Sequence, residues 1–331
     1  DALRFWLERG VDGFRVDAIV TLFESETGTP DEDFVCENHP ETHVFLKSVR
    51  SLLDEYEDRA MLAEAWAAPD KSAAYFGSGD DEFHMSMSLM LSLGVMGALT
   101  QDKPAAYLQT WQQAKAPLPP GAQLSTFLGN HDRPRILSAL GDDASKVALA
   151  TVFLLSVPGT PILYYGDAIS VPDGSDVVVD RRDRARTPMP WSAEPHAGFS
   201  ASTPWLDLAP GWQSANVAAA EADPDSLLQL TRLMIAARND HGALGTAPLE
   251  LVDLAEGDPN DVLAFTRPGD KWTLLALLGF SDQAQTLSLD PATLSFSKAE
   301  LLVALADVPE LTSDQTLTLP PHGYALWRLL P

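Results

Sequence analysis

The residues of this chain that could do chemistry stand within or directly after short apolar runs. They are Arg15 and Asp17 in GFRVDA, Glu64 in LAEAW, His84 in EFHMSM, and Asn130, His131 and Asp132 in FLGNHDRPR. An unpaired charge is costly to bury, so charged side chains inside or beside apolar strands need a reason. We interpret them as parts of one polar site.

Three carboxylates suit the cleavage of a glycosidic bond. One carboxylate attacks the anomeric carbon while a protonated carboxyl gives its proton to the leaving oxygen, and in retaining enzymes the two lie about 5–5.5 Å apart. A third anion can stabilise the positive charge of the transition state. Side chains alternate along a strand, so Arg15 projects to the same side as Asp17 and can keep it ionised.

Each of these residues also has a purely structural interpretation. Arg15 and Asp17 could form an ion pair at a strand end, and Glu64 could be a charge near a helix N-terminus. The residues 130–132 could form a capped turn, and His84 could belong to the core or a pocket wall. Their joint occurrence, in order, at predicted strand ends favours the catalytic interpretation.

The elements that must position these residues alternate strand with helix. Strands are predicted at 13–17, 60–64, 83–87, 124–128 and 161–164, with helices between them such as 43–56 and 146–157. This alternation implies an α/β fold of parallel strands joined by crossover helices. In a parallel barrel of this kind the C-terminal strand ends converge on the active site.

The C-terminal part has a different pattern. From about residue 246, short alternating runs separated by turn residues, from LELVDL to YALWRLL, predict a small antiparallel β-sandwich. We therefore expect two domains, a partial catalytic barrel at 1–245 and an all-β sandwich at 246–331.

Composition limits the partners. Lys and Arg number 22 and Asp and Glu 47, which gives a formal charge of −25. Such a surface repels phosphates and anionic lipids, which argues against nucleic acid and membranes, whereas a neutral substrate is not repelled. Cys36 is the only cysteine, so neither an intrachain disulfide nor a zinc-type cluster is expected. Localisation is not defined, with the cytoplasm slightly favoured.

Three motifs resemble a known family. GFRVDAIV, MLAEAW and FLGNHD resemble the second, third and fourth signature regions of the α-amylase superfamily, glycoside hydrolase family 13. GTPILYYGD is similar to its eighth-strand segment, and RTPMPWSAEPHAGFS and PWLDL to the loop that follows in α-glucosidase-type members. The resemblance covers nearly the whole chain. It implies the C-terminal portion of a (β/α)8 TIM barrel, equivalent to strands 4–8, followed by an all-β sandwich.

The resemblance also implies roles for the carboxylates. Carried over position by position, Asp17 would be the nucleophile, Glu64 the general acid/base and Asp132 the transition-state stabiliser. Arg15 would orient Asp17, and His131 would bind hydroxyls of the sugar.

Two further substrate-binding candidates, Asn130 and His84, stand beside these motifs.

The family's first signature is not found before GFRVDA. We therefore expect this chain to be a fragment of a longer protein. No metal-ligand set can be named and no cofactor is certain, but calcium stays open, because many members bind it through the region not found here. The arginines of RRDRARTPMPW could line the pocket or pair with the acidic surface.

Three functions remain open. The favoured one is α-glucosidase-like hydrolysis of maltose or short α-glucans with retention, through a glucosyl-aspartate intermediate; FLGNHDRPRI and RTPMPW are similar to that type. The second is a maltose glucosylmutase (trehalose synthase) or another α-glucosyl transferase, which CENHPETHVFLKSVR and YFGSGDDEFHM resemble. The third is a non-catalytic barrel fragment that acts as a binding or scaffold protein. The first two share the same three carboxylates, so the motifs do not separate them.

Overall fold

The structure, a computed structural model, describes residues 1–23, 38–175, 180–290, 294–306, 308, 311 and 316–331. Its contacts divide the chain into two compact units. Unit 1 comprises Asp1–Gly94 and Leu108–Thr126, and unit 2 comprises Val95–Tyr107 and Phe127–Pro331. Cys36 lies outside the described residues.

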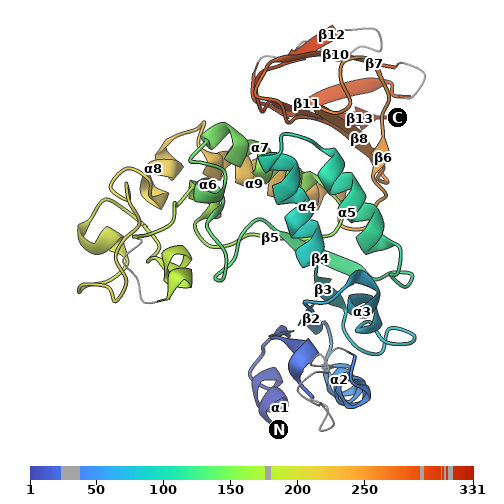
Figure 1. Ribbon diagram of the computed structural model, residues 1–331, viewed down its shortest axis with the longest axis vertical. Helices are drawn as coiled ribbons and strands as arrows, with labels where there is room; N and C mark the ends of the chain where they lie inside the picture. Colours follow the sequence, from blue (N-terminus) through green and yellow to red (C-terminus); the bar gives the residue numbers. More distant parts are fainter. Residues whose placement is uncertain (24–37, 176–179, 291–293, 307, 309–310, 312–315) are drawn as a thin grey trace, which may run out of the picture. The chain divides into compact units, whose positions relative to one another are not determined.

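Unit 1 is built on parallel strands (Figure 1). These are β1 (Gly13–Val16), β2 (Ala60–Glu64), β3 (Met85–Met87) and β4 (Gln123–Phe127), which pair in that order. Glycine is required at position 13, because an added Cβ would lie 2.2 Å from the Ala60 carbonyl oxygen. All four strands run the same way, so their C-terminal ends meet at one edge of the sheet.

The helices of unit 1 cover this sheet. They are α1 (Ala2–Leu7), the 3₁₀ turn η1 (Ile19–Thr21), α2 (Pro40–Leu53), α3 (Pro69–Ala74), α4 (Leu89–Thr100) and α5 (Ala105–Lys115), the last two extending into unit 2. Helix α2 begins with proline at its first position and buries Leu46, Val49 and Leu53 along one face. These side chains form a core cluster with Met61 and Ala63 of β2.

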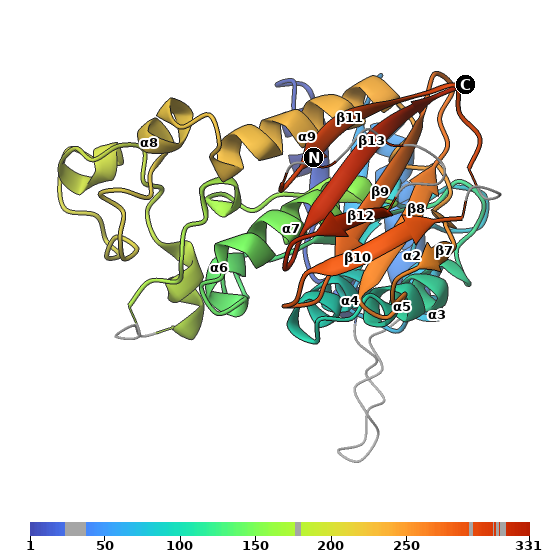
Figure 2. The same ribbon diagram turned by 90° about the horizontal axis from the view of Figure 1, so that it is seen from above.

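The first part of unit 2 is mainly helical. It contains α6 (Ile136–Ala139), α7 (Ala144–Ser156), β5 (Thr160–Ile162), the 3₁₀ turns η2 (Asp167–Ile169), η3 (Arg181–Arg186) and η4 (Pro195–Gly198), α8 (Val217–Ala222) and α9 (Leu227–His241). Helix α7 begins where the Asp143 carboxylate accepts the backbone N–H groups of Ser145 and Lys146. Both views show α7 beside α9 (Figures 1 and 2), and the two helices are in contact.

The rest of unit 2 is an all-β sandwich, whose two sheets form separate layers in Figure 1. Its strands are β6 (Glu250–Leu251), β7 (Leu254–Glu256), β8 (Val262–Arg267), β9 (Thr273–Gly279), β10 (Gln285–Leu289), β11 (Lys298–Ala304), β12 (Thr316–Leu319) and β13 (Tyr324–Leu330). One sheet has the order β12-β10-β7 and the other β11-β13-β9-β8-β6. Inward side chains of both sheets, such as Leu277, Leu287 and Trp327, form one core.

A buried arginine ties the sandwich to the helical part of unit 2. The Arg267 side chain on β8 is fully buried, and its guanidinium donates to the carbonyl oxygens of Ser156 (2.6 Å), Ala247 (2.7 Å), Pro248 (3.1 Å) and Leu244. Ser156 is the last residue of α7, so the cation also meets the negative end of that helix. Burial lowers the pKa of Arg267 to about 10.

The predicted fold class is confirmed: parallel strands with helices precede a sandwich. The bounds of β2 and β13 are those predicted, whereas β3 begins two residues later than predicted, at Met85. LELVDL was expected to be one strand but forms two, β6 in one sheet and β7 in the other. The change to all-β structure falls between α9 and β6, and the domain boundary at residue 245 stays a prediction.

Candidate active site

Arg15 brings two predicted catalytic carboxylates together at the C-terminal ends of β1 and β2. Val16 pairs with Ala63, so Asp17 and Glu64 follow side by side. Arg15 Nη1 lies 2.6 Å from Asp17 Oδ1, and Arg15 Nη2 lies 2.5 Å from Glu64 Oε1. One guanidinium group thus bridges both carboxylates, an arrangement that its fork of donors favours.

The two carboxylates differ in their access to water. The Glu64 side chain is 7% exposed and the Asp17 side chain 72%. The second oxygen of Glu64, Oε2, accepts a hydrogen bond from the backbone N–H of Ala18 at 3.1 Å. Ala18 is left-handed, with φ of 43°, a conformation that costs a non-glycine residue about 1 kcal/mol or more. The strained turn thus helps to fix a buried carboxyl beside an exposed one.

His84 lies elsewhere in unit 1. It precedes β3, and its Nδ1 accepts a hydrogen bond from the backbone N–H of Met61 at 3.0 Å, near the start of β2. Glu64 stands at the opposite end of that strand. Burial lowers the pKa of His84, which favours the neutral imidazole that such an acceptor requires. We therefore leave His84 out of the proposed site.

The motif that follows β4 forms a tight turn in unit 2. Asn130 is 8% exposed, and its Oδ1 accepts the backbone N–H of Asp132 at 2.9 Å. His131 Nε2 lies 3.1 Å from Asp132 Oδ2. Asn130 therefore shapes the turn, as the structural interpretation of these residues expected, while His131 and Asp132 extend from it side by side.

Two arginines of RRDRARTPMPW, for which the sequence left open pocket lining or pairing with the acidic surface, contact Asp132. Arg182 Nη1 and Arg186 Nη2 lie 3.3 Å and 3.1 Å from Asp132 Oδ1, and Arg186 Nε donates to the His131 carbonyl oxygen at 2.8 Å. The arginine density of RRDRAR was the available signal. Because these two arginines are 50 and 54 residues from Asp132, no local pattern pairs them with it.

Two buried ionisable side chains, Arg135 and Asp167, lie in the segments that follow this turn in unit 2. The Arg135 side chain is fully buried, donates to the Tyr165 carbonyl oxygen at 2.7 Å, and lies 4.6 Å from the Tyr165 ring centroid. Asp167 is 5% exposed, and its Oδ2 accepts the backbone N–H of Tyr164 at 3.1 Å. Burial raises the pKa of Asp167 to about 7, against the opposing effects of that N–H group and of Arg135.

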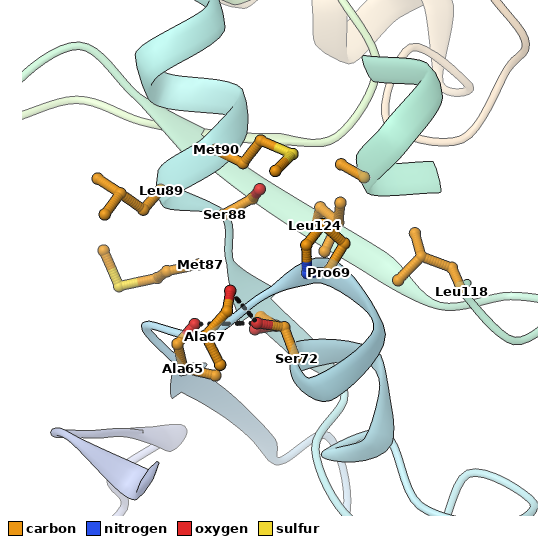
Figure 3. Close-up of a pocket in the computed structure, with 12 residues that line it drawn as sticks. Ala65, Ala67, Pro69, Ser72, Met87, Ser88, Leu89, Met90, Leu118 and Leu124 are labelled. Carbon is orange, nitrogen blue, oxygen red and sulfur yellow. Dashed lines mark hydrogen bonds between the residues drawn. The ribbon is translucent and has the colours of Figure 1, made fainter. Parts of the chain in front are cut away.

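A small cavity adjoins the end of β2 in unit 1 (Figure 3). Its volume is about 20 Å³, which suits a single water molecule and no sugar. The Ser72 hydroxyl donates to the carbonyl oxygens of Ala65 (3.1 Å) and Ala67 (3.2 Å) beside this cavity, as the dashed lines show. These bonds fix the backbone that follows Glu64.

The part of the chain that the structure describes has no group of three or more His, Cys, Asp or Glu placed to hold a metal ion. We therefore derive no step through calcium. No described helix is long and apolar enough to cross a membrane. Asp17 and Glu64 belong to unit 1 and Asp132 to unit 2, and their convergence stays a prediction.

Comparison with known proteins decides the family. The model described as "Alpha amylase, catalytic domain" matches residues 1–247. The chain belongs to the alpha-amylase family. This confirms the resemblance of GFRVDAIV, MLAEAW and FLGNHD to the family's signatures, because all three motifs lie within the matched residues.

Relatives within the alpha-amylase family carry two kinds of name. The trehalose synthase/amylase of Mycolicibacterium smegmatis is 38% identical over 381 residues, covering 99% of this chain and 62% of that protein. The trehalose synthase/amylase of Mycobacterium tuberculosis is 34% identical over 375 residues, covering 99% and 60%. An oligo-1,6-glucosidase of Parageobacillus thermoglucosidasius is 27% identical over 383 residues, covering 99% and 67%. The chain thus spans about 60% of the length of the trehalose synthase/amylase relatives.

Solved structures show the same fold. An isomaltulose synthase of Erwinia rhapontici matches with a TM-score of 0.83 at 22% identity, covering 99% of this chain and 67% of that one. An alpha-amylase of H. orenii matches with a TM-score of 0.77 at 22% identity, covering 99% and 62%. The chain therefore has the architecture of a partial TIM barrel followed by a β domain.

Proposed function

We propose that this chain carries the catalytic carboxylates of a retaining α-glucosidase acting on maltose or short α-glucans. Asp17 attacks the anomeric carbon and forms a glucosyl ester, while Glu64 gives its proton to the leaving glycosidic oxygen. Glu64 then takes a proton from water, whose oxygen attacks the anomeric carbon and releases Asp17. Asp132 stabilises the positive charge that develops in both transition states.

The observation that carries the proposal is the Arg15 bridge. Retaining chemistry needs its two carboxyl groups about 5–5.5 Å apart, and a guanidinium that contacts both keeps two carboxylates near one another. Arg15 touches both at 2.6 Å and 2.5 Å. Arg15 is thus a positioning residue, and His131, beside Asp132, is the candidate for contact with sugar hydroxyls.

Hydrolysis, as opposed to transfer to a sugar, is supported by the motifs FLGNHDRPRI and RTPMPW, which are similar to α-glucosidase-type members. Hydrolysis requires water to reach the glucosyl ester formed on Asp17. A glucosylmutase must instead exclude water while the released glucose turns and re-attacks.

The mutase stays a second candidate for a different reason. The relatives named trehalose synthase/amylase are 34% and 38% identical to this chain, whereas the oligo-1,6-glucosidase is 27% identical. Both candidates use the same carboxylates, so only their products separate them.

The test is to incubate the protein with maltose and to follow the anomeric protons by NMR. The hydrolase proposal expects the glucosyl unit to be released as α-glucose, which adds an early excess of the α-anomer to the anomeric mixture that the reducing-end glucose brings, and mutarotation then removes that excess. Trehalose as the main product would support the mutase instead. Asp17→Asn is the control, and unchanged turnover by that variant would overturn the assignment of the nucleophile.

A further inference from the structure

A fully buried arginine of unit 2 has no role in the proposed reaction so far. Arg135 stands three residues after Asp132, and its side chain is completely shielded from water. A buried charge is costly unless its hydrogen-bonding groups find partners, so the partners of Arg135 indicate what this side chain holds in place.

The guanidinium lies against the segment that contains η2. Arg135 Nη1 donates to the Tyr165 carbonyl oxygen at 2.7 Å, and the central guanidinium carbon lies 5.3 Å and 4.6 Å from the ring centroids of Tyr164 and Tyr165. Gly166 has φ of 88°, and an added Cβ there would lie 2.7 Å from Arg135 Nη1. Glycine thus lets the backbone approach the cation closely, and the segment encloses the guanidinium tightly.

The backbone of Arg135 is also fixed. Its N–H donates to Asp173 Oδ1 at 2.8 Å, and the Asp173 N–H donates to the Ser138 hydroxyl at 3.0 Å. Asp173 is 7% exposed, so water competes little for these bonds. They set the direction in which the chain leaves the turn that carries His131 and Asp132.

Thr187 connects Arg135 to a second arginine that touches Asp132. Arg135 Nη2 donates to the Thr187 hydroxyl at 3.4 Å, and the Tyr165 hydroxyl donates to the Thr187 carbonyl oxygen at 2.7 Å. Thr187 directly follows Arg186, whose Nη2 lies 3.1 Å from Asp132 Oδ1. The contacts therefore form a closed ring, which leaves Asp132 along the chain and returns to it through Arg186.

Such a ring matters for a carboxylate that stabilises developing charge. The group must be held to within about 0.5 Å, and a displacement of about 1 Å can lower the rate by about 100-fold. Arg186 is a weak brace by itself, because its side chain is 28% exposed and also contacts Asp183 at 3.4 Å. Arg135 supplies the buried, fixed part of the ring.

A purely structural role is the alternative, and Arg267 is an example of it in the same unit. The Arg267 side chain is equally buried, and its acceptors belong to the end of α7 and to residues 244–248. Arg267 thus joins a helix to the sandwich, whereas the segments that Arg135 joins lead to Asp132. The two arginines form a matched pair for an experiment.

We propose that Arg135 is a positioning residue that holds Asp132 where it stabilises positive charge on the glucosyl ring. The inference rests on the proposed function, since Asp132 has this task only in that reaction. Because Arg135 is buried and acts through Asp132, its effect falls on the charged transition state and leaves the binding of a neutral sugar unchanged.

The experiment compares a cationic ligand with a neutral one in the full-length protein. A basic iminosugar shaped like glucose carries a positive charge on its ring, as the transition state does, whereas maltose is neutral. Arg135→Lys keeps the charge but cannot reach Tyr165 and Thr187 together, and we expect it to raise the inhibition constant of the iminosugar by about 10-fold. The KM for maltose should stay within about twofold of the parent. Arg267→Lys, the matched control, should change neither constant, since a loss of folded protein lowers only the apparent kcat.

Asp132→Asn separates the two levels of the proposal. If this variant binds the iminosugar as tightly as the parent, or if the parent turns over no maltose, the proposed function fails and the inference fails with it. If Asp132→Asn weakens iminosugar binding but Arg135→Lys does not, the role of Arg135 is overturned and the proposed function stands. Equal rises of both constants in Arg135→Lys, or an equal effect of Arg267→Lys, would overturn it too.

A second variant covers the case in which Arg135→Lys does not fold, as judged by circular dichroism. Thr187→Val keeps the shape of the side chain and removes the hydroxyl that accepts from Arg135. It should raise the inhibition constant of the iminosugar by about threefold, the loss typical of one hydrogen bond, with KM for maltose unchanged. An unchanged inhibition constant would overturn the proposal.

Discussion

The substitution Asp167→Asn tests whether a buried carboxyl makes stability depend on pH. Asp167 is 5% exposed and its pKa is raised by burial to about 7, whereas an aspartate in an unfolded chain titrates near pH 3.9. Below about pH 4 the Asp167 carboxyl is protonated in both the folded and the unfolded protein. Between about pH 4 and 7 only the folded state keeps the proton, so stability falls as the pH rises, and the loss is complete above about pH 7.

The size of this effect follows from the two pKa values. The two values differ by about 3 pKa units, and each unit corresponds to about 1.4 kcal/mol. The ionisation of Asp167 therefore lowers the free energy of unfolding by about 4 kcal/mol in total, of which about 3 kcal/mol falls between pH 5 and 8. Asparagine cannot ionise, but its carbonyl oxygen can still accept the Tyr164 N–H. We therefore expect the stability of Asp167→Asn relative to the parent to rise by about 3 kcal/mol over that interval.

The assay is urea unfolding at pH 5 and 8, followed by both tryptophan fluorescence and circular dichroism so that coincident transitions can be checked. Histidines titrate in the same interval, but their contribution cancels in the difference between parent and variant. The matched control is Asp270→Asn, at an exposed position, whose stability relative to the parent should be the same at pH 5 and 8. Parallel curves of stability against pH for parent and Asp167→Asn would refute the reasoning, because Asp167 would then be ionised in the folded protein.

Two further substitutions test the Arg15 bridge and the buried anchor of the sandwich. Arg15→Lys keeps the charge, but one ammonium group cannot contact Asp17 and Glu64 together as the guanidinium does. The loss of one charged hydrogen bond, worth about 1.5–3 kcal/mol, should lower kcat/KM for α-glucosyl fluoride by about 10- to 100-fold. A kcat/KM within twofold of the parent would contradict the bridge. Arg267→Met leaves four carbonyl oxygens without their donor and should lower the free energy of unfolding by about 3–5 kcal/mol in urea titrations. A loss below about 1 kcal/mol would show that water replaces the guanidinium.

The sequence predicted those parts of the fold and site that depend on local pattern. β2 is an apolar run bounded by polar residues, and its limits match the prediction. Arg15 and Asp17 are two residues apart, and the strand period alone predicts that their side chains lie on one side of β1. The contact between Arg15 and Asp17 confirms that step.

Other features depend on contacts that no local pattern contains. The contact of Arg15 with Glu64 follows from the register of β1 against β2, which pairs residues far apart in the chain. The contacts of Arg182 and Arg186 with Asp132 depend on the path of a long loop. Helix α4 (Leu89–Thr100) is apolar on all sides, so its sequence lacks the period that tells a helix from a strand.

The central claim is that Asp17 forms a covalent bond to glucose, and trapping that bond tests it most directly. The protein would be treated with a fluorinated α-glucosyl fluoride whose glucosyl ester hydrolyses slowly, then digested and measured by peptide mass spectrometry. The account predicts one added fluoroglucosyl group, located on Asp17 by fragmentation and absent from Asp17→Asn. A protein that turns over maltose but carries the label on another residue, or carries none, would contradict it.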